Sequence, residues 1–263
     1  MKYWIIALLV TLAAAYYQRI TGPTYPVKAR IHLNGDEISY KLPRSAETSG
    51  DVQIEIPVPS GTSGILKYKR YNTPDNWTEF SLQATGGMIK PILPVQPAAG
   101  KLVYEIELIH NNQTIPLHSE PVVIRFKNPV PAWALIPHVI LIFIAMLLSN
   151  LTGLLAVFKK PKIRLYVWIT VLVLFAGGMI MGPVVQKFAF GEYWTGVPFG
   201  WDLTDNKTLI AMMVWIAALI ANYKKPSYGW IIAAAVVMLV IFLIPHSMFG
   251  SELDYATGIV RQG

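Results

Sequence analysis

The sequence predicts an α+β membrane protein, with an extracytoplasmic β-sandwich, a four-helix transmembrane bundle and an N-terminal anchor or signal helix. Hydrophobic residues make up 54% of the 263 residues and charged residues only 14%, whereas a water-soluble domain is about 25% charged. The second half of the chain contains four long apolar stretches without a charged residue. Residues 27–128, which precede them, alternate between apolar and polar side chains in several short runs. These observations favour a β-domain followed by membrane-spanning helices.

Each apolar stretch approaches the roughly 20 residues that a membrane-spanning helix requires. The third stretch is short, but it can extend back to Asp205. The four stretches are residues 132–158, 165–185, 209–223 and 228–244. We therefore expect the transmembrane bundle over residues 132–246 and a separate tail over residues 247–263.

The N-terminal residues 1–20 are also apolar and allow two interpretations. Ala13-Ala14-Ala15 could end a cleaved secretory signal. Alternatively, Tyr16 and Tyr17 form an interfacial aromatic belt on a retained anchor. We favour the retained anchor, and both interpretations place the following segment outside the cytoplasm.

The distribution of charge supports this topology. Basic residues without neighbouring acids occupy the expected inner positions, namely Lys2, Lys159, Lys160, Lys162, Arg164, Lys224 and Lys225. Acidic residues occupy the expected outer positions, namely Glu192, Asp202, Asp205, Glu252 and Asp254. This pattern follows the positive-inside rule and predicts a bacterial cytoplasmic membrane protein with an extracytoplasmic β-domain and C-terminus. Because topology explains the net charge of +7, the charge gives no reason to expect nucleic-acid binding.

The predicted β-domain covers residues 27–128. Leu102, Tyr104, Ile106 and Leu108 alternate with polar residues, as in a half-buried strand. Asn34-Gly35 and Asn111-Asn112 are typical of hairpin turns. The length of this segment and the spacing of its short strands resemble those of immunoglobulin-like or fibronectin-like domains. This resemblance implies a packed sandwich rather than a catalytic fold. We expect its histidines, His32, His110 and His118, to be surface or hydrogen-bonded residues.

Two histidines lie at the outer ends of predicted helices. His138 follows Pro137 in the first bundle helix, and His246 follows Pro245 at the end of the fourth. Polar groups at membrane depth are functional candidates, and two histidines from facing helices could bind one haem b. Another metal is an alternative, with Met179, Met181 and Met248 as thioether ligands for copper. The structural alternative is that each ring bonds a free backbone carbonyl near a proline.

The loop between the second and third helices carries a more specific signal. Gly191-Glu192-Tyr193-Trp194, then Trp201-Asp202, then the apolar residues 209–219 resemble the tryptophan-rich segment of haem-handling membrane proteins of cytochrome c assembly. The resemblance spans residues 182–215. In that family an aromatic loop presents haem between flanking histidines. It therefore implies that His138 and His246 are axial ligands, that Trp194 and Trp201 form a haem platform, and that Asp202 orients a ligand or contacts the propionate side.

The sequence departs from that family at three places. Phe190 stands where a tryptophan is expected, residues 195–200 separate the two tryptophan elements, and Leu203-Thr204-Asp205 replaces a proline-basic-acidic run. The chain also has fewer predicted helices than a complete member. A fainter likeness, over residues 137–153 and 246–258, is to an uncharacterised bacterial four-helix membrane family.

Several of these residues also have structural interpretations. The loop aromatics could be an interfacial belt, and Asp202 or Asp205 could be the N-cap of the third helix. We expect Lys207 to pair with one of these acids and Asn150 to bond across to another helix. Gly178 and Gly182 have the spacing of a close helix contact, and Gly182-Pro183 should kink or end the second helix.

These observations lead to two functional hypotheses. The first is a membrane subunit that binds or handles haem at the extracytoplasmic face, in electron transfer or cytochrome assembly. The second is a non-catalytic scaffold or accessory subunit that docks an extracytoplasmic partner through its β-sandwich. Both favour a protein that is not an enzyme. Both place it in a lipid bilayer with membrane or periplasmic protein partners, in a redox or assembly complex under the first hypothesis. The absence of cysteine excludes disulfides and thiolate ligands.

Overall fold

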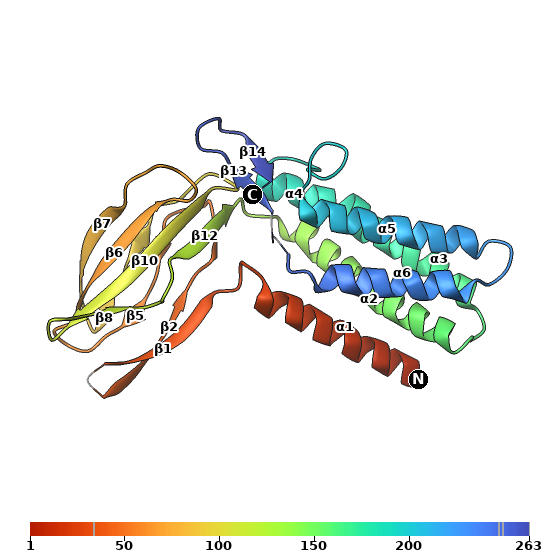
Figure 1. The fold of residues 1–263 in the computed structure, drawn as a ribbon, viewed down its shortest axis with the longest axis horizontal. Coiled ribbons are helices and arrows are strands. Elements are labelled where there is room, and N and C mark those ends of the chain that lie inside the picture. The colour runs from red at the N-terminus through yellow and green to blue at the C-terminus, as the bar shows by residue number, and fades with distance from the viewer. Residues whose placement is uncertain (34, 247, 249, 263) are drawn as a thin grey trace. The chain divides into compact units, whose positions relative to one another are not determined.

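A computed structural model describes residues 1–33, 35–246, 248 and 250–262. The chain divides into two compact units. The helical unit includes Met1–Pro23 and Val130–Ser251, and the β-unit comprises Thr24–Pro129 and Glu252–Arg261. Figure 1 shows helices in the first unit and strands in the second. The predicted mixture of α and β structure is therefore confirmed.

The helical unit contains the expected apolar helices. They are α1 (Lys2–Thr21), α2 (Ala132–Val157), α3 (Ile163–Leu174), α4 (Gly182–Phe190), α5 (Leu203–Ala221) and α6 (Tyr228–Leu243), with the π-helical segment η1 (Phe175–Met181) between α3 and α4. Among the described residues, four segments are long and apolar enough to cross a membrane: Lys2–Thr21, Ala132–Val157, Ile163–Phe190 and Leu203–Ala221. Helix α6 is apolar but shorter. Length and composition thus fit a membrane protein.

Helix α1 packs against α2 and α6 rather than standing apart from the other helices. Its buried side is made of the small residues Ala7, Thr11 and Ala14, which allow close approach of a neighbouring helix. Asn150 on α2 donates from Nδ2 to Thr11 Oγ1 at 3.0 Å. The predicted cross-helix bond of Asn150 is confirmed, and α1 is an integral helix of this unit.

The helices run alternately between two ends. The lysine end consists of the turns 158–162 and 222–227, and the Asp202 end consists of the loop 191–202 and residues 244–246, 248, 250 and 251. The ring of Tyr3, at the start of α1, lies 5.1 Å from the ring of Phe158 at the lysine end. Gln18, near the other terminus of α1, donates to the carbonyl of Ile244 at 3.4 Å at the Asp202 end. The inner basic turns and the outer-loop acids Glu192, Asp202 and Asp205 therefore lie at opposite ends of this unit, whereas Glu252 and Asp254 belong to the β-unit.

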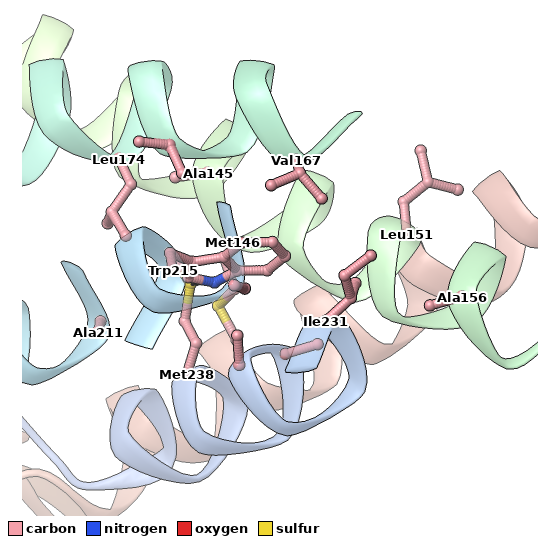
Figure 2. Close-up of a cluster of buried hydrophobic side chains, with 14 of the residues drawn as sticks. Ala145, Met146, Leu151, Ala156, Val167, Leu174, Ala211, Trp215, Ile231 and Met238 are labelled. Atoms are coloured by element: carbon pink, nitrogen blue, oxygen red, sulfur yellow. Dashed lines mark hydrogen bonds between the residues drawn. The ribbon is translucent and has the colours of Figure 1, made fainter. Parts of the chain in front are cut away.

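A single tryptophan occupies the centre of the helical core (Figure 2). Trp215 on α5 has no exposed surface. Its indole Nε1 donates to Met238 Sδ on α6 at 3.2 Å, which satisfies a donor that burial removes from water. Ala145 and Ala211 lie in the same cluster, and their small side chains leave room for the indole.

Gly182-Pro183 is expected to kink or to end the second helix. The second span does not end there, because it continues to Phe190. Proline has no N–H to continue the α-helical bonding pattern. In the preceding segment η1 the pattern shifts, and the Gly182 N–H donates to the Gly177 carbonyl five residues earlier. The chain then continues as α4. A Cβ atom on Gly178 would lie 2.7 Å from Thr208 Cγ2 on α5, which confirms the expected close helix contact at Gly178.

The β-unit is built on one six-stranded sheet and several two-stranded sheets. In the large sheet the strands lie in the order β3-β12-β10-β6-β7, with β11 paired to β10; the small sheets are β1–β2, β4–β9 and β5–β8, and a further pair, β13–β14, lies near the C-terminus. The strands are β1 (Val27–Leu33), β2 (Asp36–Leu42), β3 (Ser45–Glu47), β4 (Val52–Gln53), β5 (Ile56–Pro57), β6 (Ser63–Arg70), β7 (Thr78–Gln83), β8 (Met88–Ile89), β9 (Ile92–Leu93), β10 (Lys101–His110), β11 (Gln113–Pro116), β12 (Val122–Lys127), β13 (Ser251–Leu253) and β14 (Val260–Gln262).

The predicted hairpins and strand faces are present. Strands β1 and β2 pair up to Leu33 opposite Asp36, and Gly35 in the turn has a φ of +89°, while Asn34 lies outside the described residues. Asn111 and Asn112 both have positive φ between β10 and β11, as a type I′ turn requires. The four alternating residues of β10 face the core, which strands of the large and small sheets share.

Residues after α6 add to the β-unit. Glu252 forms an ion pair with Lys101, and the Tyr255 hydroxyl donates to the Lys101 carbonyl at 3.0 Å. Burial raises the pKa of Tyr255 to about 12, because an ionised phenol would lose its hydration there. Residues 252–261 therefore pack on the β-unit, although the sequence suggests one separate tail over residues 247–263.

We expect Gly153→Ala to destabilise the helical unit. A Cβ atom at Gly153 would lie 2.6 Å from Ala235 Cβ, so α2 and α6 would have to separate, at a cost of about 1–3 kcal/mol for overpacking. Thermal unfolding in detergent, followed by circular dichroism, measures the effect. Gly229→Ala on α6 is the matched control, because a Cβ there would meet nothing within 4 Å. Equal unfolding temperatures for the two variants would contradict the close α2–α6 contact.

Candidate functional site

The first turn of α5 organises the Asp202 end of the helical unit. Asp202 is the N-cap residue, and its Oδ1 accepts from the backbone N–H groups of Thr204 at 2.8 Å and Asp205 at 3.4 Å. Its Oδ2 accepts from the N–H and hydroxyl groups of Ser251, at 3.1 and 2.9 Å. The N-cap interpretation of Asp202 is confirmed. Both carboxylate oxygens are therefore already bonded within the helical unit.

Asp205 and Asn206, in the first turn of α5, bind the aromatic loop, residues 191–202. Asp205 Oδ2 accepts from the N–H groups of Thr195 at 2.6 Å and Gly196 at 3.0 Å. Asn206 Oδ1 accepts from the N–H of Val197 at 2.8 Å. A Cβ atom on Gly196 would lie only 2.6 Å from Asp205 Cβ, so the loop can approach this closely only with glycine. Three consecutive loop amides, which form no helix or strand, thereby obtain acceptors.

Lys207, also in the first two turns of α5, binds backbone carbonyls rather than an acid. Only 5% of its surface is exposed, and its ammonium donates to the carbonyls of Ile244 at 2.8 Å and Pro245 at 3.3 Å. The expected ion pair of Lys207 with an acid is therefore wrong for the described residues. The carbonyls at the end of a helix have no partners within it, and a cation there is also favoured by the helix dipole. Lys207 thus supplies the C-terminal cap of α6.

His138 has a fixed hydrogen bond within the helical unit. Its Nδ1 lies 2.9 Å from the carbonyl oxygen of Gly177 in η1. A carbonyl only accepts, so Nδ1 carries the proton and Nε2 is the nitrogen with the free lone pair. The Gly177 carbonyl also accepts from the Gly182 N–H, next to Pro183. This bond is the structural alternative for His138, and it leaves Nε2 unprotonated.

His246 lies at the same end of the helical unit. It follows α6, is exposed, and lies near His138, Lys207 and Asp202. The sequence thus places both histidines correctly at one end. Among the described residues, no group of three or more His, Asp or Glu side chains could hold a metal ion. A haem with two axial histidines needs only the pair.

The aromatic residues of the loop face outward. The exposed fraction is 73% for Trp201 and 83% for Phe199, and Tyr193 is also exposed. Trp194 is half-buried, and its Nε1 donates to the carbonyl of Val197 in its own loop at 3.1 Å. These exposures match an interfacial aromatic belt. The platform role of Trp194 and Trp201 toward haem stays a prediction.

Sequence reasoning identified Asp202 and Asp205 but missed most of their partners. Gln186 donates to the Thr195 hydroxyl at 2.7 Å, and that hydroxyl donates to Asp205 at 3.2 Å. Ser251 lies 49 residues from Asp202 in the sequence, so no local pattern connects them. The available signal was the polar run Asp205-Asn206-Lys207 at the start of an otherwise apolar helix.

Comparisons of this chain with protein-family models, with curated proteins and with solved structures find no match.

Asp205→Ala should release the aromatic loop from α5. The amides of Thr195 and Gly196 would lose their acceptor, and we expect their hydrogen exchange to accelerate at least about tenfold, as the loss of roughly 1.4 kcal/mol or more of local stability implies. Hydrogen–deuterium exchange resolved on peptides of the loop measures this. Glu192→Ala removes an exposed acid from the same loop and should leave both amides protected. Unchanged protection in Asp205→Ala would show that the carboxylate does not hold the loop.

Proposed function

We propose that this chain is a non-catalytic accessory subunit of a bacterial cytoplasmic membrane, which docks an extracytoplasmic protein through its β-unit. The topology is supported by the lysine end, which carries Lys159, Lys160, Lys162, Lys224 and Lys225 and faces the cytoplasm under the positive-inside rule. The β-unit lies in the sequence between the end of α1 and the start of α2. Both of these helix termini belong to the opposite, Asp202 end, so the β-unit is extracytoplasmic.

The proposed docking domain is an immunoglobulin-like sandwich. Support comes from the shared core, in which Leu42 and Ile56 of the small sheets pack with Leu102 and Ile124 of the large sheet. A packed sandwich of this kind has its interior filled by side chains, and its free surfaces are its faces, loops and edge strands. The function of such a domain therefore depends on its outer surface.

The main support for this proposal is the exposed edge strand β7. It ends the strand order of the large sheet, pairs with β6 among the described residues, and exposes five of its six residues. Edge strands are normally protected by charged residues, above all lysine, or by proline, a bulge or very short length. Strand β7 has no lysine or proline, and its one charged residue, Glu79, lies opposite Lys67 of β6. Phe80 is 48% exposed on it and stacks on Tyr68 of β6 with ring centroids 5.9 Å apart.

An extended segment of a protein partner fits this edge. Backbone N–H and C=O groups along the open side of an edge strand can pair with an added strand, and neighbouring side chains then select its sequence. Trp77, which a Lys69 ammonium covers at 5.4 Å from its ring centroid, and Phe80 provide apolar contacts beside that edge. We infer β-strand addition as the docking mode.

The docking proposal predicts that Ser81→Lys weakens partner binding at least tenfold, since a charge on an edge strand opposes strand addition. The chain has no cysteine, so a single Ser81→Cys variant can carry a photo-crosslinker that captures the partner for identification by mass spectrometry. The affinity of the purified partner for each variant is then measured by calorimetry. Gln113→Lys, on the exposed strand β11, is the control and should change the affinity less than twofold. Equal weakening by both substitutions would refute docking at β7.

Binding of haem b, in electron transfer or cytochrome assembly, is the second candidate function. The supporting observation is the bond from His138 Nδ1 to the Gly177 carbonyl, because axial histidines commonly donate their non-coordinating N–H to a backbone carbonyl. His138 and His246 would hold the iron, Trp194 and Trp201 would flank the ring, and Asp202 would act on the propionate side. Bound haem would supply one-electron redox chemistry. The bonds of Asp202 to Ser251 and to the α5 amides favour the accessory function over this one.

A Soret band tests the haem candidate. If haem b binds, protein from haem-replete cells should show the band, and both His138→Ala and His246→Ala should lose it because each removes an axial ligand. Absorbance spectroscopy, with haemin titration of the purified protein, provides the measurement. His118→Ala in the β-unit is the control, because that ring bonds to Glu120 locally. A colourless preparation that takes up no haemin would eliminate this candidate and leave the accessory function.

A further inference from the structure

Helices α3 and α5 form a groove at the lysine end of the helical unit. One part of it, about 520 Å³ in volume, is lined by apolar side chains together with Lys224 and Lys225. An adjoining part, about 190 Å³ in volume, includes Arg164. Trp168, Leu219 and Tyr223 line both parts. The two parts therefore form one continuous depression.

The cationic rim of this groove is held in place by specific bonds. The Arg164 guanidinium donates to the carbonyl of Lys224, which ties the start of α3 to the turn after α5. Asn222 is buried and stabilises the same turn, because its Oδ1 accepts from the Ser227 N–H at 2.7 Å and its Nδ2 donates to Ala218 O at 2.7 Å. The side chains that line the groove include three basic residues and no acid. These bonds fix Arg164 and the backbone of the turn that carries the two exposed lysines, so the rim is positively charged.

The apolar part of the groove lies on the last turn of α5 and the first turns of α3. Trp168 is 48% exposed and Ile220 is 69% exposed, and both belong to helices apolar enough to cross a membrane. Beside the basic residues of the turn, the groove is lined by Trp168, Tyr223 and the aliphatic side chains of Leu219 and Ile220. An aromatic residue at this level is typical of the headgroup region.

We propose that the α3–α5 groove selectively binds an anionic phospholipid. Its phosphate would lie against Lys224, Lys225 and Arg164, and one acyl chain would lie along Trp168, Leu219 and Ile220. The groove places basic side chains beside apolar ones, as the phosphate of such a lipid lies beside its acyl chains, and lysines near an anionic headgroup gain electrostatic attraction. A helix of a second protein would satisfy the apolar part but would leave three clustered cations without counter-charge. The proposal requires neither the docking function nor haem.

Native mass spectrometry of the full chain in mixed micelles with equal phosphatidylglycerol and phosphatidylcholine tests this proposal. Wild-type protein should retain phosphatidylglycerol preferentially. The Lys224→Gln/Lys225→Gln variant should lower the retained ratio of the two lipids about tenfold, from the loss of two attractive charges. Lys159→Gln/Lys160→Gln removes the same charge from the same end, outside the groove, and should change that ratio less than twofold.

The apolar part has its own test in Trp168→Ala, which should reduce the total lipid retained by at least about threefold. Trp230→Ala is its control, because Trp230 is exposed on α6 and does not line the groove. Glycerol phosphate added in excess should fail to displace the lipid if the acyl chain contributes to binding. Equal retention of both lipids by wild-type protein would overturn the proposal, as would equal loss in the two lysine variants. Circular dichroism confirms that each variant is folded.

Discussion

At the Asp202 end, backbone N–H and C=O groups at the helix ends and in the aromatic loop have no partner within a helix. Side chains of one short segment, residues 202–207, form hydrogen bonds with them. Asp202 accepts from the first amides of α5, Asp205 from the aromatic loop, and Lys207 donates to the last carbonyls at the end of α6. A buried backbone group without a partner costs about 1–3 kcal/mol. The three buried charged side chains therefore take the place of water as hydrogen-bond partners for the backbone of three different segments. The outward display of Phe199 and Trp201 depends on the rigidity that these bonds give to the loop.

The same requirement connects Pro183 to His138. Just before the proline the helix has five-residue spacing in η1, and the Gly177 carbonyl accepts from the Gly182 N–H. That carbonyl also accepts from the imidazole of His138 on α2. The two helices can approach this closely because residue 177 is glycine, where a Cβ atom would lie only 2.8 Å from Leu141 Cβ. A local defect in one helix thus orients a histidine on another, in a way that suits both a purely structural histidine and an axial ligand.

The candidate site was predictable in its location but not in its bonding. His138, His246 and Asp202 were placed at one end of the bundle because apolar stretches alternate direction and the lysines mark the opposite end. The N-cap role of Asp202 followed from its position just before an apolar helix. The acceptors of Lys207 could not be inferred, because they are main-chain atoms 37 and 38 residues away that no side-chain pattern reveals. An opposite charge nearby in the sequence suggested an ion pair instead.

The sequence by itself determined which segments are helices, which strands alternate, and where hairpins turn, because hydrophobic period and turn residues act over a few positions. It also determined the sorting of lysines to one end. Only the tertiary structure decided that α1 packs through Ala7 and Thr11 against α2, that residues 252–261 belong to the β-unit, and that β7 ends its sheet. Those outcomes depend on contacts between residues far apart in the chain, whose free energies are set by packing and by the pairing of backbone groups rather than by local preference.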